Sequence, residues 1–182
     1  MAPPPTQEEA IARLGPLLLA GGAAYRKVGQ AFIKQGTPGE TLETVIDGKV
    51  ETTNTVGEGD WIVRADTASK ERYIITDAKF RRLYAPEPVP FAGHPDAAEL
   101  EAEGFKAYAP CGRCLALKAT AELIQEHLPG GQFIAAWGSP MLVEEGDFLA
   151  APAPPGAAGK PEAVAEVYRI ERGAFAQTYE AE

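Results

Sequence analysis

The sequence predicts an α+β protein built from two pseudo-symmetric small units, each a bent antiparallel sheet with short helices. Two blocks of sequence recur, a Pro-rich segment lies between them, and short strand-like patterns alternate with amphipathic ones. The chain has 182 residues, and half of it has a limited hydrophobic core of its own. We therefore expect the two units to pack on each other.

In the first half, a helix precedes a series of short strands. Thr6 and Glu9 have the spacing of a capping box, and aliphatic residues three and four apart follow it. Pro16 should kink or end this helix, because proline lacks an amide donor and clashes with the preceding turn. We then expect strands at residues 25–34, 61–63 and 73–75, a hairpin at 42–50 with Asp47-Gly48 at its tip, and a short helix at 77–83.

The second half contains a pattern of apolar residues at helical spacing. It predicts one amphipathic helix that is stopped by Pro129 and two glycines. The apolar stripe consists of Cys114, Leu117, Ala121, Ile124 and Leu128. Strands are expected at residues 132–137 and 148–150, and a loop at the low-complexity stretch 151–161.

The Pro-rich segment is the best candidate for a boundary between units. We expect four parts along the chain: an N-terminal tail and helix at 1–24, a first unit at 25–86, a connector at 87–104, and a second unit with an inserted helix at 105–182.

Two sequence blocks occur once in each half. Residues 56–62 and 143–149 both read Val-x-Glu-Gly-Asp-aromatic-aliphatic, and residues 73–84 and 168–179 both read Tyr-x-Ile-x4-Phe-x3-Tyr. The Tyr-x-Ile strand would present both apolar side chains on one face, and Phe and Tyr four apart would share one side of a helical turn. These shared patterns predict an internal duplication.

The same blocks resemble a family of small bacterial and phage-encoded proteins named for a Pro-Gly-Asp-Tyr-Gly (PGDYG) motif. Residues 57–84 resemble it best, and residues 137–150 with 168–179 resemble it as a second copy. Glu58 and Glu145 stand where the motif has proline, and the final glycine of the motif is absent from both copies. The resemblance implies a fold unit and no settled function.

Charge and composition argue against several classes of partner. The 26 acidic and 17 basic residues give a net charge of -9, whereas nucleic acids and anionic membrane surfaces attract a surplus of Lys and Arg. No apolar run has the length of a spanning helix, and the N-terminus lacks the basic segment of a secretory signal. We expect a cytoplasmic protein.

Cys111 and Cys114 suggest two kinds of chemistry. A Cys-x-x-Cys pair in front of a helix favours the thiolate of its first cysteine, as in dithiol oxidoreductases. However, no βαβ pattern precedes it, and Cys114 lies on the apolar stripe, so we favour a structural role. Together with His127 and His94 the pair copies part of a zinc-finger spacing, but the second histidine that a finger needs after His127 is missing. We expect no metal and no cofactor.

Asp60 and Asp147 follow glycine at equivalent positions, where an aspartate usually bonds nearby backbone N–H groups. We therefore expect both to be structural. Large aromatic residues are expected in the core: Trp61, Tyr73, Phe80, Tyr84, Trp137, Tyr168, Phe175 and Tyr179.

One polar cluster is the candidate ligand site. Its members are Glu51, Thr53 and Asn54 at a strand end, flanked by Tyr25, Arg26 and Lys27. The second copy has no such cluster, so the shared fold does not require it, and it could bind a small, polar, anionic ligand. The alternative is the solvated face of a β-rich segment.

The sequence favours an accessory protein that binds a small molecule or a protein partner, and a homo-oligomer remains open. The alternative is a cofactor-free enzyme acting on a small polar or anionic substrate, at a site on the first unit or between the units. No phosphate loop, dinucleotide fingerprint, nucleophile elbow or zinc-protease motif occurs, so no catalytic residue is assigned.

Overall fold

The computed structural model describes residues 2–46, 49–68, 70–154 and 159–182. The protein is a mixed α+β protein with antiparallel sheets, as predicted. The chain forms two compact units, the first made of Met1–Lys27 with Gly112–Glu182, and the second of Val28–Cys111. The first unit is therefore discontinuous in sequence, and the chain passes from one unit to the other twice.

These units differ from the expected division of the chain. The expected connector, residues 87–104, lies inside the second unit, and residues 25–27 belong to the first unit. The connector stays with the second unit because its backbone bonds to the sheet there, with Val89 paired to Ala107.

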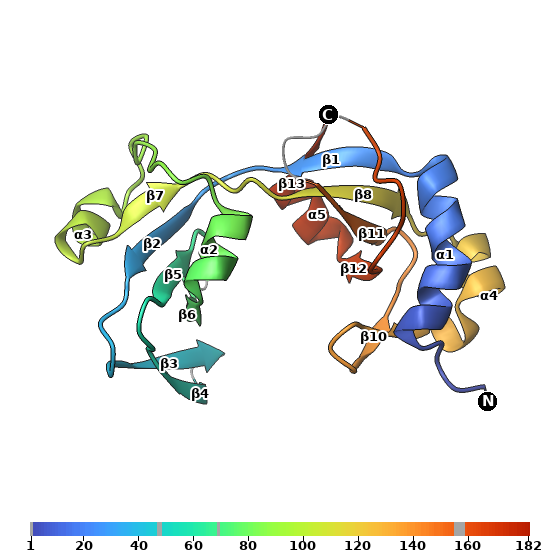
Figure 1. Ribbon diagram of the computed structural model, residues 1–182, viewed down its shortest axis with the longest axis horizontal. Coiled ribbons are helices and arrows are strands. Elements are labelled where there is room, and N and C mark those ends of the chain that lie inside the picture. The colour runs from blue at the N-terminus through green and yellow to red at the C-terminus, as the bar shows by residue number, and fades with distance from the viewer. Residues whose placement is uncertain (1, 47–48, 69, 155–158) are drawn as a thin grey trace. The chain divides into compact units, whose positions relative to one another are not determined.

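A five-stranded antiparallel sheet in the order β12-β11-β8-β1-β13 forms the centre of the first unit (Figure 1). Its strands are β1 (Ala23–Lys27), β8 (Arg113–Lys118), β11 (Phe148–Ala153), β12 (Tyr168–Ile170) and β13 (Tyr179–Ala181). The rest of the unit consists of helices α1 (Gln7–Gly21), α4 (Ala121–His127) and α5 (Arg172–Thr178), the short η1 (Pro129–Gly131), and the hairpin of β9 (Gln132–Ile134) and β10 (Pro140–Leu142).

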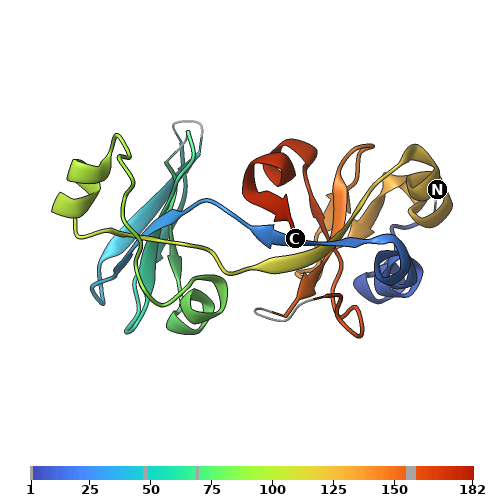
Figure 2. The same cartoon turned by 90° about the horizontal axis from the view of Figure 1, so that it is seen from above.

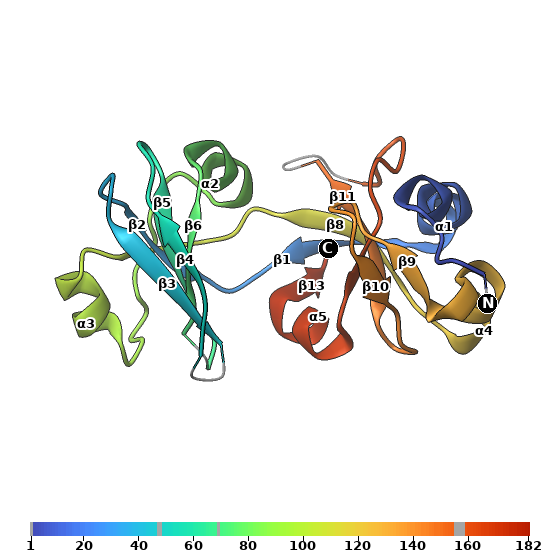
Figure 3. The ribbon, with the colours of Figure 1, turned by 90° about the horizontal axis from the view of Figure 1, so that it is seen from below.

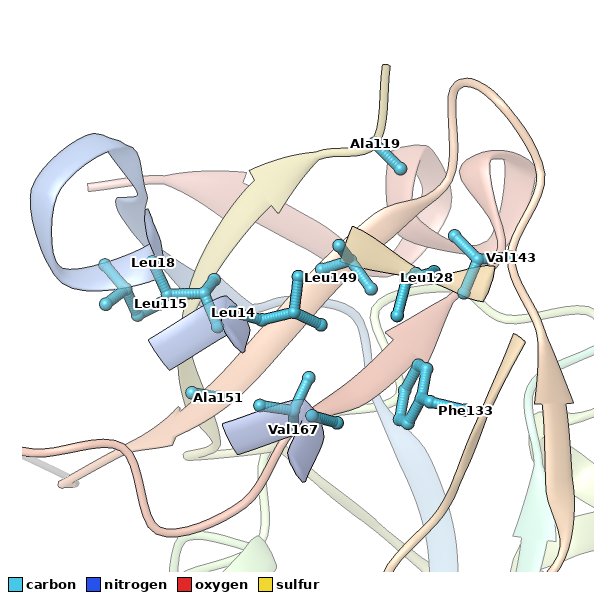
Figure 4. Packing of buried hydrophobic residues seen from close by; sticks show 11 residues of the cluster. Leu14, Leu18, Leu115, Ala119, Leu128, Phe133, Val143, Leu149, Ala151 and Val167 are labelled. Atoms are coloured by element: carbon cyan, nitrogen blue, oxygen red, sulfur yellow. The ribbon is translucent and has the colours of Figure 1, made fainter. Parts of the chain in front are cut away.

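Helices cover both faces of this sheet. Leu14 and Leu18 of α1 pack with Leu115 and Leu149 on one face (Figure 4). On the other face, Phe175 of α5 packs with residues that include Cys114. Cys114 and Leu115 are neighbours on β8, and successive residues of a strand point to opposite faces.

The second unit has the same layering around a four-stranded sheet in the order β6-β5-β2-β7. Its strands are β2 (Ala31–Gln35), β5 (Trp61–Ala65), β6 (Arg72–Ile75) and β7 (Lys106–Tyr108), with a separate hairpin of β3 (Thr41–Ile46) and β4 (Lys49–Thr55). Helices α2 (Asp77–Leu83) and α3 (Ala97–Ala102) lie on opposite sides of the sheet (Figures 2 and 3). Phe80 of α2 packs with Ile33, and Leu100 of α3 packs with Phe32.

Several local predictions are confirmed. The capping box of Thr6 and Glu9 is formed, and helix α2 occupies residues 77–83. The hairpin is formed by β3 and β4, whereas its predicted tip, Asp47-Gly48, lies outside the described residues.

The helix predicted on the Cys114–Leu128 stripe was wrong for its first part and right for its last part, where α4 occupies Ala121–His127. Residues 113–118 form strand β8, and the helix begins only after Thr120, whose side chain accepts a hydrogen bond from the N–H of Leu123. Cys114, Leu115 and Ala116 in the middle of β8 are buried on both faces of the sheet, and a strand of that kind has continuous apolar residues that mimic helical spacing.

Two further predictions need correction. The strand expected at residues 25–34 is interrupted at residues 28–30, where Gly29 has a φ of 93° and the chain leaves the first unit. Helix α1 continues past Pro16 to Gly21. Leu14 and Leu18 on either side of Pro16 are both buried, so core packing offsets the cost of about 3 kcal/mol that an interior proline imposes.

Candidate functional site

The predicted ligand-site residues fall in two different compact units. Tyr25, Arg26 and Lys27 lie on β1 of the first unit, and Glu51, Thr53 and Asn54 lie on β4 of the second. Neither unit contains both sets. A single site that includes all six residues therefore stays a prediction.

On β1, the three residues have different surroundings. The ring of Tyr25 meets the ring of Phe175 edge-on at 4.8 Å, as part of the aromatic core. Arg26 is exposed and pairs with Glu180 at 3.2 Å. Partial desolvation of the Lys27 ammonium lowers its pKa, while the nearby Cys114 acts in the opposite direction.

On β4, Thr53 and Asn54 are exposed and lie opposite Glu43 and Leu42 of β3. The side chain of Glu51 lies outside the described residues. These strands form the separate β3–β4 hairpin. An exposed polar face of such a hairpin matches the alternative interpretation that the sequence left open.

A connected group of charges in the second unit was not predicted. Arg64, a buried residue on β5, pairs through Nη2 with a carboxylate oxygen of Asp96 at 2.5 Å. The ammonium of Lys70 contacts the same oxygen at 2.9 Å. Hydrogen bonds from Lys70 and Arg64 lower the pKa of Asp96. These residues are scattered between positions 64 and 96 without a fixed spacing, so no sequence pattern could have revealed them.

His94 extends this network. Its Nε2 lies 2.9 Å from a carboxylate oxygen of Asp66, and its Nδ1 accepts a hydrogen bond from the N–H of Asp96 at 3.1 Å. Because both ring nitrogens already have protein partners, His94 is held in one orientation and neither nitrogen is offered to a substrate. The network therefore ties the loop after β5 to the start of α3.

The two cysteines are unpaired and belong to different units. Cys111 donates a hydrogen bond to the carbonyl of Arg82. Cys114 is fully buried, and its burial raises the pKa of the thiol to about 12. A thiol with such a pKa is a poor nucleophile at neutral pH, which supports the structural role predicted for Cys114. In the part of the chain that the structure describes, no group of three or more His, Cys, Asp or Glu could hold a metal ion.

The two Gly-Asp turns have the predicted geometry. Asp60 accepts a hydrogen bond from the N–H of Gly57 at 2.9 Å, and Asp147 accepts one from the N–H of Glu144 at 2.9 Å. Both carboxylates thus close a turn before a strand, and the structural role predicted for them is confirmed.

The prediction that all large aromatic residues are core was wrong for Trp137 and Tyr73. Trp137 is 63% exposed and Tyr73 38% exposed. Trp137 sits in the turn between β9 and β10, and Leu142 on β10 is 56% exposed. By contrast, Phe80 and Phe175 are buried as predicted.

The first unit also has a shallow apolar groove of about 250 Å³ along helix α1. Its lining residues are Ile11, Ala12, Gly15, Pro16, Leu19, Glu162, Ala163 and Val164. The groove contains one charged side chain, so it has little means of orienting a polar substrate.

The chain matches no protein-family model, no curated protein and no solved structure. The resemblance to the PGDYG family thus remains a prediction from the residues that carry it. Among the described residues, no helix is long and apolar enough to cross a membrane.

Proposed function

We propose that this protein is a non-catalytic accessory protein that binds a partner protein through the tip of its β9–β10 hairpin. The observation that carries the proposal is the exposed indole of Trp137, 63% accessible, in the turn of a hairpin whose second strand, β10, ends at the exposed Leu142. Tryptophan is enriched among the residues that dominate the energy of protein–protein binding.

The hairpin is anchored at its base. Phe133 on β9 and Val143 directly after β10 are both core residues of the first unit (Figure 4). The turn is closed by hydrogen bonds from the N–H of Ala135 to the carbonyl of Ser139 and from the N–H of Gly138 to the carbonyl of Ala135. A loop that is already ordered loses less conformational entropy on binding.

The charge of the chain indicates the kind of partner. Glu144 and Glu145 are exposed just after the hairpin, and the whole chain has a net charge of -9. We infer that the partner offers an apolar pocket for Trp137 surrounded by Lys and Arg, because complementary charge favours encounter and orientation.

Enzymatic function has less support. The charged groups around the buried Arg64, including Asp96 and His94, are already paired with one another. The small anionic ligand predicted from the sequence, a cytoplasmic location and membership of the PGDYG family are further parts of the proposal.

The first test examines whether the hairpin tip is uncovered. The chain contains two tryptophans, Trp61 and Trp137. In a Trp61→Phe variant, Trp137 should show red-shifted fluorescence and ready quenching by acrylamide, at all protein concentrations. Blue-shifted emission that resists quenching would mean that the rest of this chain, or a second copy, already covers Trp137, and the proposal would be wrong.

The second test identifies the partner. A photo-crosslinking amino acid at position 137, introduced in the source cells, should give one discrete adduct that a Leu142→Asp change removes. The same amino acid at Val50, which is 54% exposed in the second unit, is the matched control and should not give that adduct. With the purified partner, Trp137→Ala should weaken binding by about 30-fold, equivalent to about 2 kcal/mol. Unchanged affinity would exclude this surface.

A further inference from the structure

The two sheets are built to the same plan in the same register. In the second unit Val63 of β5 pairs with Tyr73 of β6 and with Ile33 of β2. In the first unit Ala150 of β11 pairs with Tyr168 of β12 and with Ala116 of β8. Thus the strands β2, β5 and β6 correspond to β8, β11 and β12, and the recurring sequence blocks occupy equivalent positions.

The helix that follows these strands also corresponds. Trp61 stacks on Phe80 of α2 with ring centroids 4.2 Å apart, and Phe148 stacks on Phe175 of α5 at 3.7 Å. In each case the N–H of the tyrosine four residues later caps the helix by bonding the carbonyl of that phenylalanine.

Each sheet has a fourth strand, β7 next to β2 and β1 next to β8, and this strand comes from the other half of the chain. Tyr108 of β7 pairs with Ala31 of β2, and Tyr25 of β1 pairs with Cys114 of β8. Beyond these pairs, Tyr84 faces Pro110 and Tyr179 faces Lys27. The strands β7 and β1 are therefore equivalent. Their sequences agree, since each contains Ala-Tyr and a glycine follows beyond the strand, with three residues between the tyrosine and the glycine.

The helices before these strands agree as well. Helix α3 precedes β7, and its Leu100 packs on Phe32 of β2. Helix α1 precedes β1, and its Leu14 packs in one cluster with Leu115 of β8. Phe32 and Leu115 are equivalent, since each follows the residue that pairs with the tyrosine. The α1–β1 segment thus has the same place in the first unit that α3–β7 has in the second.

We propose that the chain consists of two tandem repeats, residues 7–84 and 97–181, which exchange their first helix–strand segments. Each repeat begins with the segment α1–β1 or α3–β7 and continues with its own sheet strands. In each compact unit, however, the segment comes from the other repeat. Neither unit is complete without residues of both repeats.

The two crossing points support an exchange. The chain leaves the first unit after Lys27 and re-enters it at Gly112. The stretches there, Lys27-Val28-Gly29 and Pro110-Cys111-Gly112, have the glycine that a three-residue hairpin turn requires at its last position, and the second has proline where such a turn favours it. Each stretch could thus close a hairpin within its own repeat. The exchange then needs a change of backbone conformation only in these two stretches, as in the hinge of a domain-swapped protein.

The first test cuts the full-length protein between the repeats. Residues 86–90 are exposed, so a protease recognition sequence can be inserted between Glu87 and Pro88. After cleavage, the two fragments should co-elute on size exclusion and separate only in denaturant, because each holds a helix–strand segment of the other. Elution as two separate folded fragments would overturn the exchange.

The second test uses cross-strand disulfides in the full-length protein with Cys111→Ser. Arg26 lies directly opposite Glu180, and the equivalent residue Ala109 bonds Ala85. With exchange, Arg26→Cys/Glu180→Cys should oxidise and hold the cleaved fragments in one band on a non-reducing gel. The matched control, Arg26→Cys/Ala85→Cys, should keep both thiols. The reverse result, with only the control pair oxidised, would show that each repeat keeps its own segment.

Discussion

The buried carboxylate of Asp147 accepts a hydrogen bond from Nε of Arg169 at 2.8 Å. Backbone N–H groups of Glu144 and Arg172 donate to the same carboxylate at 2.9 and 3.2 Å. Asp147 thus joins the turn before β11 to strand β12 and to the start of α5. This one side chain holds together three segments of the first unit.

Replacing Asp147 should therefore be costly. Asp147→Ala leaves the Arg169 guanidinium and two backbone N–H groups without their acceptor in a partly buried position, and we expect the free energy of unfolding to fall by about 2–4 kcal/mol. Asp60→Ala is the control, since Asp60 closes the same turn in the second unit but is partly exposed, and water can replace it. Its loss should be below about 1 kcal/mol. Equal losses in urea denaturation would contradict this difference.

The same carboxylate should make stability depend on pH. Burial by itself would raise the pKa of Asp147, but the donors of Glu144, Arg169 and Arg172 outweigh it, and the pKa lies below its usual value. A carboxyl with a lowered pKa stabilises the folded state above its unfolded pKa of about 3.9, and that contribution is lost as pH falls through the folded value.

Urea denaturation of the wild type and Asp147→Asn at a series of pH values tests this dependence. Because asparagine does not titrate, the gap in unfolding free energy between the two proteins should be largest near neutral pH and should shrink below about pH 4. A gap that stays constant into that acidic range would show that Asp147 does not contribute through its charge.

The sequence predicted the elements whose signals are local. Thr6 and Glu9 mark the start of α1, and Asp77 to Leu83 form the predicted helix, because caps and short amphipathic turns depend on neighbouring residues. The first part of the stripe from Cys114 to Leu128 is a strand instead of a helix, since Cys114–Ala116 of β8 are buried on both faces and are apolar at every position. Only tertiary packing distinguishes such a buried strand from a helix with an apolar stripe.

The candidate site was harder to predict for the same reason. Tyr25 and Asn54 were grouped as neighbours along the first half of the chain, yet the chain passes into another compact unit after Lys27. The pairing of β1 with β8 places Tyr25 in the first unit, and such a long-range pairing cannot be predicted from the local sequence. The exposure of Trp137 depends on how the rest of the chain packs around the β9–β10 turn, and composition does not reveal that packing.

The cysteines should differ in reactivity and in structural cost. Burial raises the pKa of the Cys114 thiol to about 12, so alkylation of the folded protein should label Cys111 first. Cys114→Ser places a hydroxyl among Ala116, Ala150 and Phe175 and should cost about 1–2 kcal/mol. Cys111→Ser should leave stability and binding unchanged, because a hydroxyl can still donate to the carbonyl of Arg82.

Peptide mapping after alkylation and thermal denaturation of the two variants measure these effects. Labelling of Cys114 in the native protein, or a loss of partner binding on Cys111→Ser alone, would contradict the structural role assigned to this pair.

The predicted anionic ligand can be tested with variants on both units. Arg26→Ala removes an exposed ion pair with Glu180, which is worth about 0.2–1 kcal/mol, so the melting temperature should change little. In a thermal-shift screen of anionic metabolites, a ligand at 100 times its Kd should stabilise the wild type by about 2.7 kcal/mol.

If the six residues form one site, Arg26→Ala and Asn54→Ala should each abolish that stabilisation, although they lie on β1 and β4 of different units. If only one variant loses it, the site belongs to one unit alone. If both variants keep the full shift, these residues form no ligand site, and the exposed hairpin at Trp137 remains as the binding surface.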